Sequence, residues 1–333
     1  MKIESTAIIG SGGWGTALAA LWGRQGNTVT LWGHTPDRVK HIAATRKNAD
    51  YLADVELPSS IRVTSELGDC VDADLIVFVT PSKALRTVAA QLQPLVKNAA
   101  AIMLSCTKGI EHGSGLRMSE IVAEYFPRNA IAVLSGPNLA VEVARGLPTA
   151  TVLGCHQPDI AASLQQHLGS ERFRVYTSHE VTGIELGGAL KNIFAISAGV
   201  SDGFGFGDNS KAALVNRSFA ELLRVGVAMG GEPATFQGLS GAGDLIATCF
   251  SRHSRNRRVG EQLGQGKSIE AIMNGMQMIA EGIPTARSAY ECARKLDIET
   301  PIIDQVYAVI YEGKSPAQAM HELLGRDQKA ELA

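Results

Sequence analysis

Lys191 is the side chain in this sequence best placed for proton transfer. It lies in residues 181–200, a segment that is apolar nearly all round and is typical of a central helix. A buried ammonium needs a carboxylate partner or a function, and burial lowers a lysine pKa toward the range useful for acid–base chemistry. A lysine that reaches the domain surface is the alternative. Asp244, after a glycine-rich turn, is expected as a helix N-cap, as the partner of Lys191, or as both.

Four arginines within residues 252–258 form the densest basic patch of the chain. The planar guanidinium pairs well with a phosphate dianion. A solvated surface or a nucleic-acid contact is the alternative for such a run. Because the net charge is −2 and no aromatic residues interleave the arginines, we expect a phosphate pocket and no nucleic-acid partner.

Lys108 and Asn138 each follow an expected strand, residues 101–105 and 131–135 respectively. In open α/β sheets, ligands bind beyond the carboxyl ends of the strands, so both side chains are candidates for a ligand site. A solvated loop lysine and a helix-capping asparagine are the alternatives.

The GSGGWG sequence at residues 10–15 matches the dinucleotide-binding pattern GxGxxG. It follows an expected strand, 7–9, and opens an expected helix, which is the context that the pattern requires. Gly10 permits a tight turn, Gly12 lets the backbone approach a pyrophosphate, and Gly15 lets the helix pack on the strand. An ordinary glycine-rich turn is the alternative.

The end of the second expected strand bears on the choice between NADH and NADPH. An acidic residue there selects NADH by accepting a hydrogen bond from the ribose 2′-hydroxyl. Residues 31–35 read LWGHT, without an acid, and His34 and Arg38 lie close by. NADPH is therefore favoured, with His34 as a simple turn cap as the alternative.

Short apolar segments alternate with helical segments in the first half, which predicts a parallel, doubly wound sheet of the Rossmann type. The expected strands are residues 7–9, 29–32, 75–80, 101–105, 131–135, 150–153 and 175–177. The expected helices between them are residues 16–25, 84–93, 115–125 and 138–144.

Helical segments dominate after about residue 179, which predicts an all-α C-terminal domain. They are residues 181–200, 211–229, 245–251, 268–273, 285–296, 301–312 and 315–324. We divide the chain into a dinucleotide-binding domain, 1–185, and a substrate and catalytic domain, 186–333. The glycine-containing segment 201–209 is expected to be a flexible loop that closes over the site.

The composition fits two globular domains, since the 333 residues exceed what one core usually serves. No apolar run is long enough to span a bilayer, and no secretory signal is visible. The five cysteines are scattered and form no CxxC pair, so we expect neither disulfides nor a metal site, and a cytoplasmic location.

Seven motifs resemble those of the bacterial NAD(P)-dependent glycerol-3-phosphate dehydrogenases, in order and along essentially the whole chain. They are residues 10–20 (GSGGWGTALAA), 106–111 (CTKGIE), 135–142 (SGPNLAVE), 185–192 (ELGGALKN), 239–249 (LSGAGDLIATC), 254–257 (SRNR) and 280–284 (AEGIP). The resemblance implies reversible hydride transfer between NAD(P)H and dihydroxyacetone phosphate. The product, sn-glycerol 3-phosphate, is a precursor of glycerophospholipids, and a homodimer is expected.

The resemblance also implies residue roles, with Lys191 as the catalytic acid–base residue. The implied substrate-binding residues are Lys108, Gly136, Asn138, Lys191, Asp244, Ser254, Arg255 and Asn256. The implied cofactor-binding residues are Gly10, Gly12, Gly13, Trp14, Gly15, His34, Lys108, Ala140, Arg255, Ile279 and Glu281. The family often has serine where this chain has Gly13, which removes one hydroxyl and leaves the backbone N–H groups.

Two other interpretations compete. A dehydrogenase of the β-hydroxyacid or 6-phosphogluconate type also joins a Rossmann domain to a helical domain, but the motifs at 239–249 and 254–257 argue against it. A non-catalytic nucleotide sensor or DNA-binding regulator is the second alternative, because a Rossmann domain alone does not imply catalysis.

Overall fold

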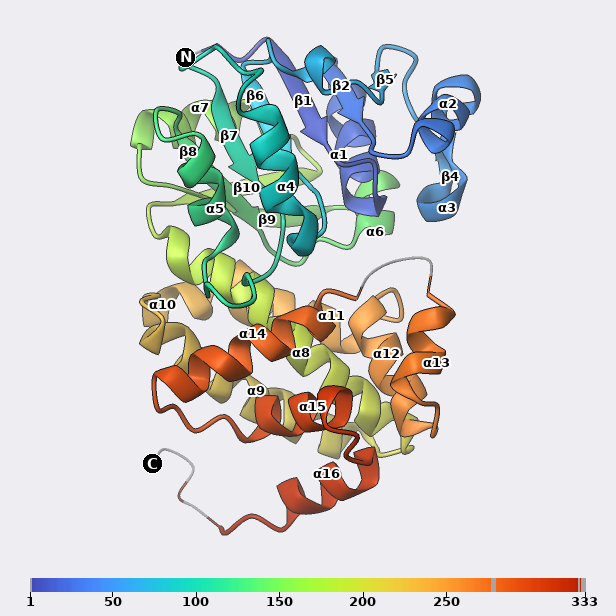
Figure 1. The fold of residues 1–333 in the computed structure, drawn as a ribbon, viewed down its shortest axis with the longest axis vertical. Helices are drawn as coiled ribbons and strands as arrows, with labels where there is room; N and C mark the ends of the chain where they lie inside the picture. Colours follow the sequence, from blue (N-terminus) through green and yellow to red (C-terminus); the bar gives the residue numbers. More distant parts are fainter. Residues whose placement is uncertain (1, 277–279, 329, 331–333) are drawn as a thin grey trace.

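The computed structural model describes residues 2–276, 280–328 and 330 and contains a sheet half and a helical half. Figure 1 shows the sheet with helices on both faces, and below it a group of helices that the chain enters through α8. This arrangement confirms the expected fold class, a Rossmann-like α/β unit followed by a helical unit. No helix among the described residues is long and apolar enough to cross a membrane.

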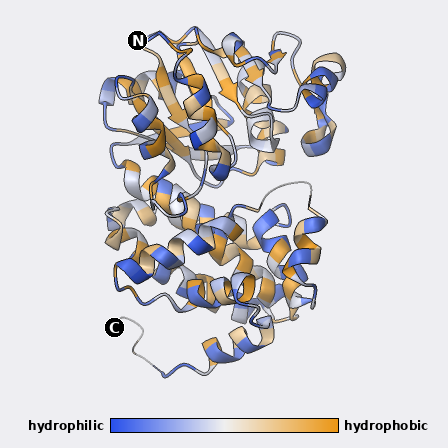
Figure 2. Ribbon diagram, in the orientation of Figure 1, coloured by the Kyte–Doolittle hydropathy of each residue, from blue (hydrophilic) through white to orange (hydrophobic). Residues whose placement is uncertain are grey.

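An eight-stranded sheet forms the centre of the first half. Its strands in spatial order are β10 (Phe173–Ser178), β9 (Thr149–Cys155), β8 (Ile131–Ser135), β7 (Ile102–Ser105), β6 (Leu75–Phe78), β1 (Ser5–Ile9), β2 (Thr28–Trp32) and β5 (Arg62–Thr64). The central strands β8, β7, β6 and β1 are apolar and largely buried, as their orange colour in Figure 2 shows, whereas the edge strands β10 and β5 are partly exposed. Strands covered on both faces need such residues. A short hairpin of β3 (Lys47–Asn48) and β4 (Ala53–Glu56) lies outside this sheet.

The sheet is parallel except where β8 pairs antiparallel with β9, which corrects the expectation of a wholly parallel sheet. The reason lies in the connection between the two strands. Its helix α6 (Ala140–Ala144) has five residues, so it is only about 7.5 Å long. A crossover between parallel strands usually carries a longer helix that traverses the sheet, and α6 is the one helix between β8 and β9.

Helices cover both faces of the sheet. They are α1 (Gly13–Arg24), α2 (Pro36–Thr45), α3 (Ala49–Leu52), α4 (Ser82–Leu92), α5 (Met118–Tyr125), α6 and α7 (Pro158–Leu168). The expected helices correspond to α1, α4, α5 and α6, whereas α2, α3, α7, strand β5 and the β3–β4 hairpin had not been predicted. Helices α2 and α7 begin with proline after an extended residue, which is a recognisable start signal.

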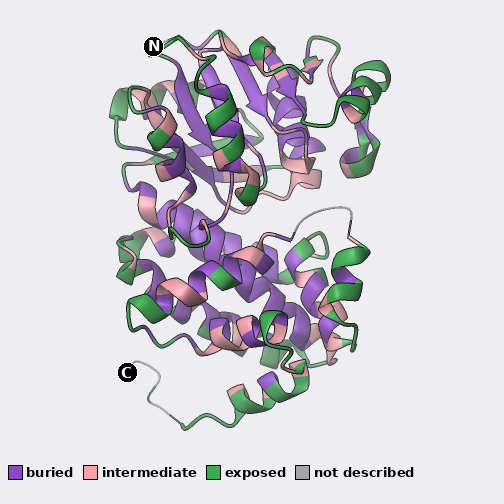
Figure 3. Cartoon of the chain, viewed as in Figure 1, coloured by how far each residue is buried: buried purple, intermediate pink, exposed green. Residues whose placement is uncertain are grey.

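The helical half is built around α8 (Val181–Gly203), which is buried along almost its whole length (Figure 3). The other helices are α9 (Asp208–Ala228), α10 (Pro233–Phe236), α11 (Asp244–Phe250), α12 (Arg255–Gly264), α13 (Ile269–Asn274), α14 (Gly282–Lys295), α15 (Pro301–Tyr311) and α16 (Pro316–Leu324). Helices α10 and α12 had not been predicted, because α10 has only four residues and the arginine-rich sequence of α12 gives no apolar signal.

Helix α12 packs on α8 with the two backbones in direct contact. A Cβ atom on Gly260 of α12 would lie 1.9 Å from the Ile196 carbonyl oxygen, and one on Gly199 of α8 would lie 1.9 Å from the Arg257 carbonyl oxygen. Real side chains do not fit at such distances, so only glycine allows this approach. The contact fixes the start of α12 beside the middle of α8.

The segment 201–209 is mostly helical, which corrects the expected flexible loop. Helix α8 continues to Gly203 and α9 begins at Asp208, so four residues connect them. The Asp202 carboxylate accepts hydrogen bonds from Lys211 Nζ at 2.8 Å and Arg257 Nε at 2.6 Å. These ion pairs hold the end of α8 in place, and the proposed closing motion has no support in the structure.

Candidate active site

The glycine turn at residues 10–15 has the geometry of a dinucleotide cradle. Gly10 has φ +129°, and a Cβ there would lie 2.7 Å from the Val79 carbonyl oxygen. A Cβ on Gly15 would lie 1.8 Å from the Gly10 carbonyl oxygen, whereas a Cβ on Gly12 would meet nothing within 4 Å. Gly12 therefore presents open backbone where a pyrophosphate would approach.

The first turn of α1 carries no acidic residue and has no side-chain cap. The helix N-terminus, with its N–H donors and positive dipole, suits an anion there. Trp14 and Ala140 pack beside the turn on the same apolar cluster. A Cβ on Gly13 would lie 3.8 Å from Tyr51 and 4.0 Å from the Cβ of Ala140, so this position has room for a side chain. These residues fit a bound dinucleotide.

A buried carboxylate joins two lysines from different halves of the chain. Asp244 Oδ1 accepts a hydrogen bond from Lys191 Nζ at 2.6 Å, and Asp244 Oδ2 accepts one from Lys108 Nζ at 2.6 Å. Lys191 also donates to Thr248 Oγ1 at 2.6 Å, and Lys108 also donates to the Gly136 carbonyl at 3.2 Å. This lysine–aspartate cluster brings both lysines to one point, although they lie far apart in sequence.

The environment of Lys191 changes its acidity. Its side chain is 9% exposed, and burial lowers its pKa to about 8. The negative charge of Asp244 opposes this change, while the positive charge of Lys108 adds to it. The alternative expectation, a lysine that reaches the domain surface, is therefore wrong. A lysine of this pKa can exchange a proton near neutral pH.

Local structure brings Asp244 to Lys191. A π-helical turn, Leu239–Gly243, directly precedes α11, and Asp244 is the first residue of that helix. A Cβ on Gly187 of α8 would lie 2.7 Å from the Ser240 carbonyl oxygen, so glycine lets this turn pack against α8. The Asp244 side chain makes no helix-capping bond, and Gly243 holds the cap position, so the N-cap expectation is wrong.

Gly136 and Asn138 lie in the turn after β8, beside this cluster. Gly136 has φ +148°, and a Cβ there would lie 3.1 Å from Thr151 Cα. Asn138 donates to the Ala150 carbonyl at 3.1 Å and accepts from Thr151 Oγ1 at 2.9 Å. Asn138 therefore ties its turn to β9 and does not cap α6, whose cap position is held by Leu139.

Asn256 links three helices near Lys191. Its Nδ2 donates to Asn192 Oδ1 at 2.8 Å, and its Oδ1 accepts from the Gly282 N–H at 2.9 Å. Asn192 directly follows Lys191 on α8. Ser254 is buried and caps α12 by accepting from the Arg257 N–H at 3.2 Å. The Ser254 side chain therefore stabilises the start of α12, the helix that carries Asn256.

Arg255 lines a pocket of about 460 Å³ between Asp50 of α3 and the helices α12 and α13. The Arg255 side chain is exposed toward the pocket. The protein around it partly removes water from the guanidinium, which lowers its pKa, while the negative charge of Glu281 opposes this effect. The four arginines do not act together, because Arg257 is paired with Asp202. Of the basic patch predicted from sequence, Arg255 and Arg258 line the pocket.

The remaining cofactor candidates come from both halves of the molecule, His34 from the sheet half and Glu281 from the helical half. His34 is exposed after β2, with its ring 6.2 Å from the Trp32 ring. Arg38 is paired with Asp50 at 2.8 Å. Glu281 precedes α14 and accepts two hydrogen bonds from Ser82 at the start of α4. Ile279 lies outside the described residues.

Sequence reasoning missed two members of the site. Thr248 binds Lys191, and the i, i+4 spacing from Asp244 was a signal that could have found it, since such residues share a helix face. Asn192 ends the motif at 185–192 but was given no role, and its contact with Asn256 depends on the packing of α12 on α8.

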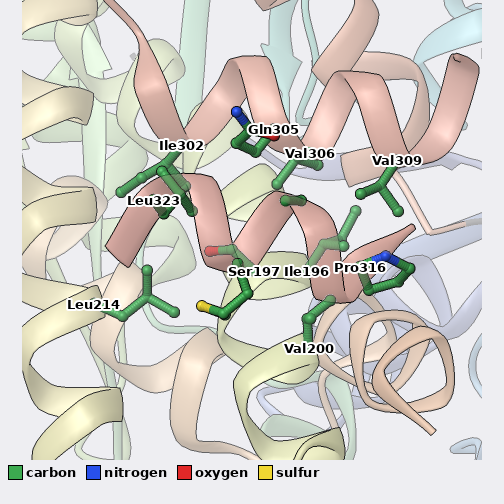
Figure 4. Close-up of a pocket in the computed structure, with 12 residues that line it drawn as sticks. Ile196, Ser197, Val200, Leu214, Ile302, Gln305, Val306, Val309, Pro316 and Leu323 are labelled. Atoms are coloured by element: carbon green, nitrogen blue, oxygen red, sulfur yellow. The ribbon is translucent and has the colours of Figure 1, made fainter. Parts of the chain in front are cut away.

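A second pocket lies away from these residues, between α8, α15 and α16 (Figure 4). Its volume is about 30 Å³, and apolar side chains such as Val306 and Leu323 dominate its lining. None of its lining residues can carry a charge, so it offers no group for catalysis.

A Rossmann-like sheet half with a glycine turn shaped for a dinucleotide, followed by a helical half that buries a lysine of lowered pKa, is typical of NAD(P)-dependent dehydrogenases. Two family profiles cover the chain: the N-terminus of NAD-dependent glycerol-3-phosphate dehydrogenase matches residues 5–161 and its C-terminus matches residues 180–321. The chain belongs to this family of glycerol-3-phosphate dehydrogenases.

Individual relatives agree over their full length. The chain is 45% identical over 330 residues to the glycerol-3-phosphate dehydrogenase [NAD(P)+] of Syntrophotalea carbinolica, covering 98% of each protein. It is 46% identical over 334 residues to that of Desulfotalea psychrophila, covering 98% of each. The crystal structure of glycerol-3-phosphate dehydrogenase from Coxiella burnetii superposes with a TM-score of 0.94, at 37% identity, covering 98% of this chain and 99% of that one.

The fold alone is shared more widely. A ketopantoate reductase from Ralstonia eutropha matches with a TM-score of 0.61 at 17% identity. A shared fold does not fix the substrate, so the site residues must carry that argument.

Proposed function

We propose that this site interconverts dihydroxyacetone phosphate and sn-glycerol 3-phosphate, with Lys191 as the catalytic acid–base residue. The observation that carries the proposal is the Asp244 carboxylate shared by Lys191 and Lys108, at 2.6 Å from each ammonium. It joins one lysine from each half, and substrate and cofactor are proposed to meet there.

The residues at the glycine turn fit NAD(P)H, which supplies the hydride when it is bound. Gly10, Gly12 and Gly15 shape the turn, and the N-terminus of α1 offers N–H groups to the pyrophosphate. Lys108 stands after β7, at the carboxyl edge of the sheet where such ligands bind. Gly13 and Trp14 of the turn, and Ala140 beside it, are further proposed contacts.

Lys191 handles the proton. As an ammonium it polarises the substrate carbonyl and protonates the alkoxide that hydride addition creates. In the oxidation direction, neutral Lys191 takes the proton from the secondary alcohol. Asp244 and Thr248 fix the position of its Nζ atom, and Lys108 keeps a second positive charge close to the developing oxyanion.

The substrate phosphate is assigned to Arg255 and Asn256 at the start of α12. Arg255 faces a pocket, and its guanidinium suits a phosphate dianion. The first turn of α12 adds the positive end of a helix dipole. Binding energy from this non-reacting group orients the ketone carbon. Gly136, Asn138 and Ser254 complete the proposed substrate site.

Coenzyme preference, the domain boundary, the cellular location and the oligomeric state are further proposals. NADPH preference rests on the absence of an acid among residues 31–35 and on the exposed His34. The boundary at residues 185 and 186 lies within α8, four residues after its start. The cytoplasmic location fits five unpaired cysteines. The homodimer stays a prediction that light scattering can measure.

The test is the loss of NADPH absorbance, then of NADH absorbance, with dihydroxyacetone phosphate as the oxidant. We expect turnover with this substrate and a kcat/KM for phosphate-free dihydroxyacetone lower by at least about 10³, because the ionic phosphate contacts are then lost. NADPH should be used with the higher kcat/KM. Equal turnover of dihydroxyacetone would refute the phosphate site, and turnover of a 3-hydroxyacid instead would favour the β-hydroxyacid class.

A further inference from the structure

Ser82 and Glu281 make a close contact between the two halves of the molecule. Glu281 Oε1 accepts a hydrogen bond from the Ser82 N–H at 3.1 Å, and Glu281 Oε2 accepts one from Ser82 Oγ at 2.6 Å. The two residues are 199 positions apart, with Ser82 at the start of α4 and Glu281 at the start of α14. We call this contact the clasp.

Helix α4 depends on the clasp for its cap. Its N-cap residue is Pro81, which has no side-chain acceptor, and no residue of α4 itself caps the helix. The first N–H groups of a helix need an acceptor, and the helix dipole favours an anion there. The Glu281 carboxylate, which feels the positive charges of Arg255 and Lys83, meets both needs from the other half.

Each side of the clasp leads to a proposed catalytic group. On the sheet side, a Cβ on Gly109 would lie 2.6 Å from the Cβ of Ser82, so the turn that carries Lys108 packs directly on Ser82. On the helical side, the N–H of Gly282, next to Glu281, donates to Asn256 at 2.9 Å. Continuous contacts therefore run from the turn of Lys108 through the clasp to Asn256.

We propose that Ser82 is a positioning residue, which sets the distance between the cofactor-holding half and the substrate-holding half through the clasp. The inference rests on the proposed roles of Lys108 and Asn256. Each half keeps its own binding residues when Ser82 is changed. The loss should therefore appear in the alignment of the reactants and much less in their binding.

The experiment compares Ser82→Ala and Ser82→Thr with the wild-type enzyme. We expect Ser82→Ala to lower kcat roughly ten-fold, within the loss that an ångström of misplacement can cause, with both KM values within about two-fold. Ser82→Thr retains the hydroxyl and should restore kcat. Ser315→Ala is the matched control, since Ser315 caps α16 far from the site, and it should lower the thermal midpoint without lowering kcat.

A double-mutant cycle with Glu281→Ala isolates the clasp. Once Glu281 is absent, adding Ser82→Ala should change kcat less than about two-fold, because the two residues act through one contact. Three results would each overturn the proposal: a kcat loss in the double variant equal to the product of the two single losses, an unchanged kcat in Ser82→Ala, or an equal kcat loss in Ser315→Ala. Kinetics are read at a temperature where circular dichroism shows every variant folded.

The experiments distinguish a failure of the proposed function from a failure of the positioning role of Ser82. A wild-type enzyme that does not reduce dihydroxyacetone phosphate sinks the substrate assignment before Ser82 is compared. Normal wild-type turnover with an unaffected Ser82→Ala variant sinks the positioning role alone.

Discussion

At the scale of single residues, Lys191 lies between opposing electrostatic effects. Burial and the nearby Lys108 charge favour its neutral form, while Asp244 favours the ammonium, and the result is a pKa of about 8. A lysine in water has a pKa near 10.4, so the fold brings this group into the range where both forms are populated.

The pH dependence of the reaction follows from this pKa. Reduction of dihydroxyacetone phosphate needs the ammonium, so its kcat/KM should fall as the pH rises through about 8. Oxidation of glycerol 3-phosphate needs the neutral amine, so its kcat/KM should rise through the same pH. Initial rates in both directions between pH 6 and 10 measure this. Profiles that move in the same direction would contradict the assigned role.

The glycine turn offers a matched pair of single-residue tests. Gly13 has room for a side chain, whereas a Cβ on Gly15 would lie 1.8 Å from the Gly10 carbonyl oxygen. Gly13→Ser should therefore leave cofactor affinity within about three-fold, since the backbone donors stay in place. Gly15→Ala should displace α1 from the turn and raise the Kd for NADPH by at least ten-fold, roughly 1.4 kcal/mol. Fluorescence titration with NADPH reports both, and equal affinities would count against the cradle.

Sequence and structure agree at this scale where chemistry is local. The glycines of the turn and the link between Lys191 and Asp244 could be predicted, because residue type and flanking elements indicate them. The sharing of Asp244 with Lys108 could not, since it depends on how the two halves meet. The different environments of Arg255 and Arg257 could not be predicted either. They depend on which face of α12 lies toward Asp202, and this helix had not been predicted.

At the scale of elements, the contact between α8 and α12 determines where the proposed phosphate site lies. Glycines on both helices bring the backbones together, and Arg255 and Asn256 begin the second helix. Helix α12 escaped prediction because four of its first six positions are polar or charged, and hydrophobic periodicity is the main helix signal. Its glycine spacing, Gly260 and Gly264, was the remaining clue.

Replacing one of these glycines tests the packing. Gly260→Ala places a Cβ 1.9 Å from the Ile196 carbonyl oxygen, so the helices must separate. We expect unfolding free energy to fall by about 1–3 kcal/mol or more, as for other overpacked sites, and the KM for dihydroxyacetone phosphate to rise. Urea denaturation and steady-state kinetics measure the two effects.

Gly68→Ala is the control for this change, because a Cβ there meets nothing within 4 Å. It should alter neither quantity. A Gly260→Ala enzyme as stable as the control would show that the helices can separate without cost, contrary to the observed contact.

At the scale of the whole molecule, the site exists only where the two halves touch. Lys108 with Asp244, Ser82 with Glu281, and Arg117 with Glu185 cross between the sheet half and the helices. Alternating apolar segments predict the sheet half, and a run of apolar helices predicts the other. Neither pattern contains information on how they dock, which is why these contacts emerge only from the structure.

Lys191, from the helical half, is proposed to exchange the proton that accompanies hydride transfer at the sheet half. The most direct measurement is kcat of the Lys191→Ala variant with saturating NADPH and dihydroxyacetone phosphate. We expect kcat to fall by roughly 10²–10⁴, the contribution of a positioned acid–base group, in a protein with an unchanged circular dichroism spectrum. A folded Lys191→Ala enzyme with near-normal kcat would contradict it.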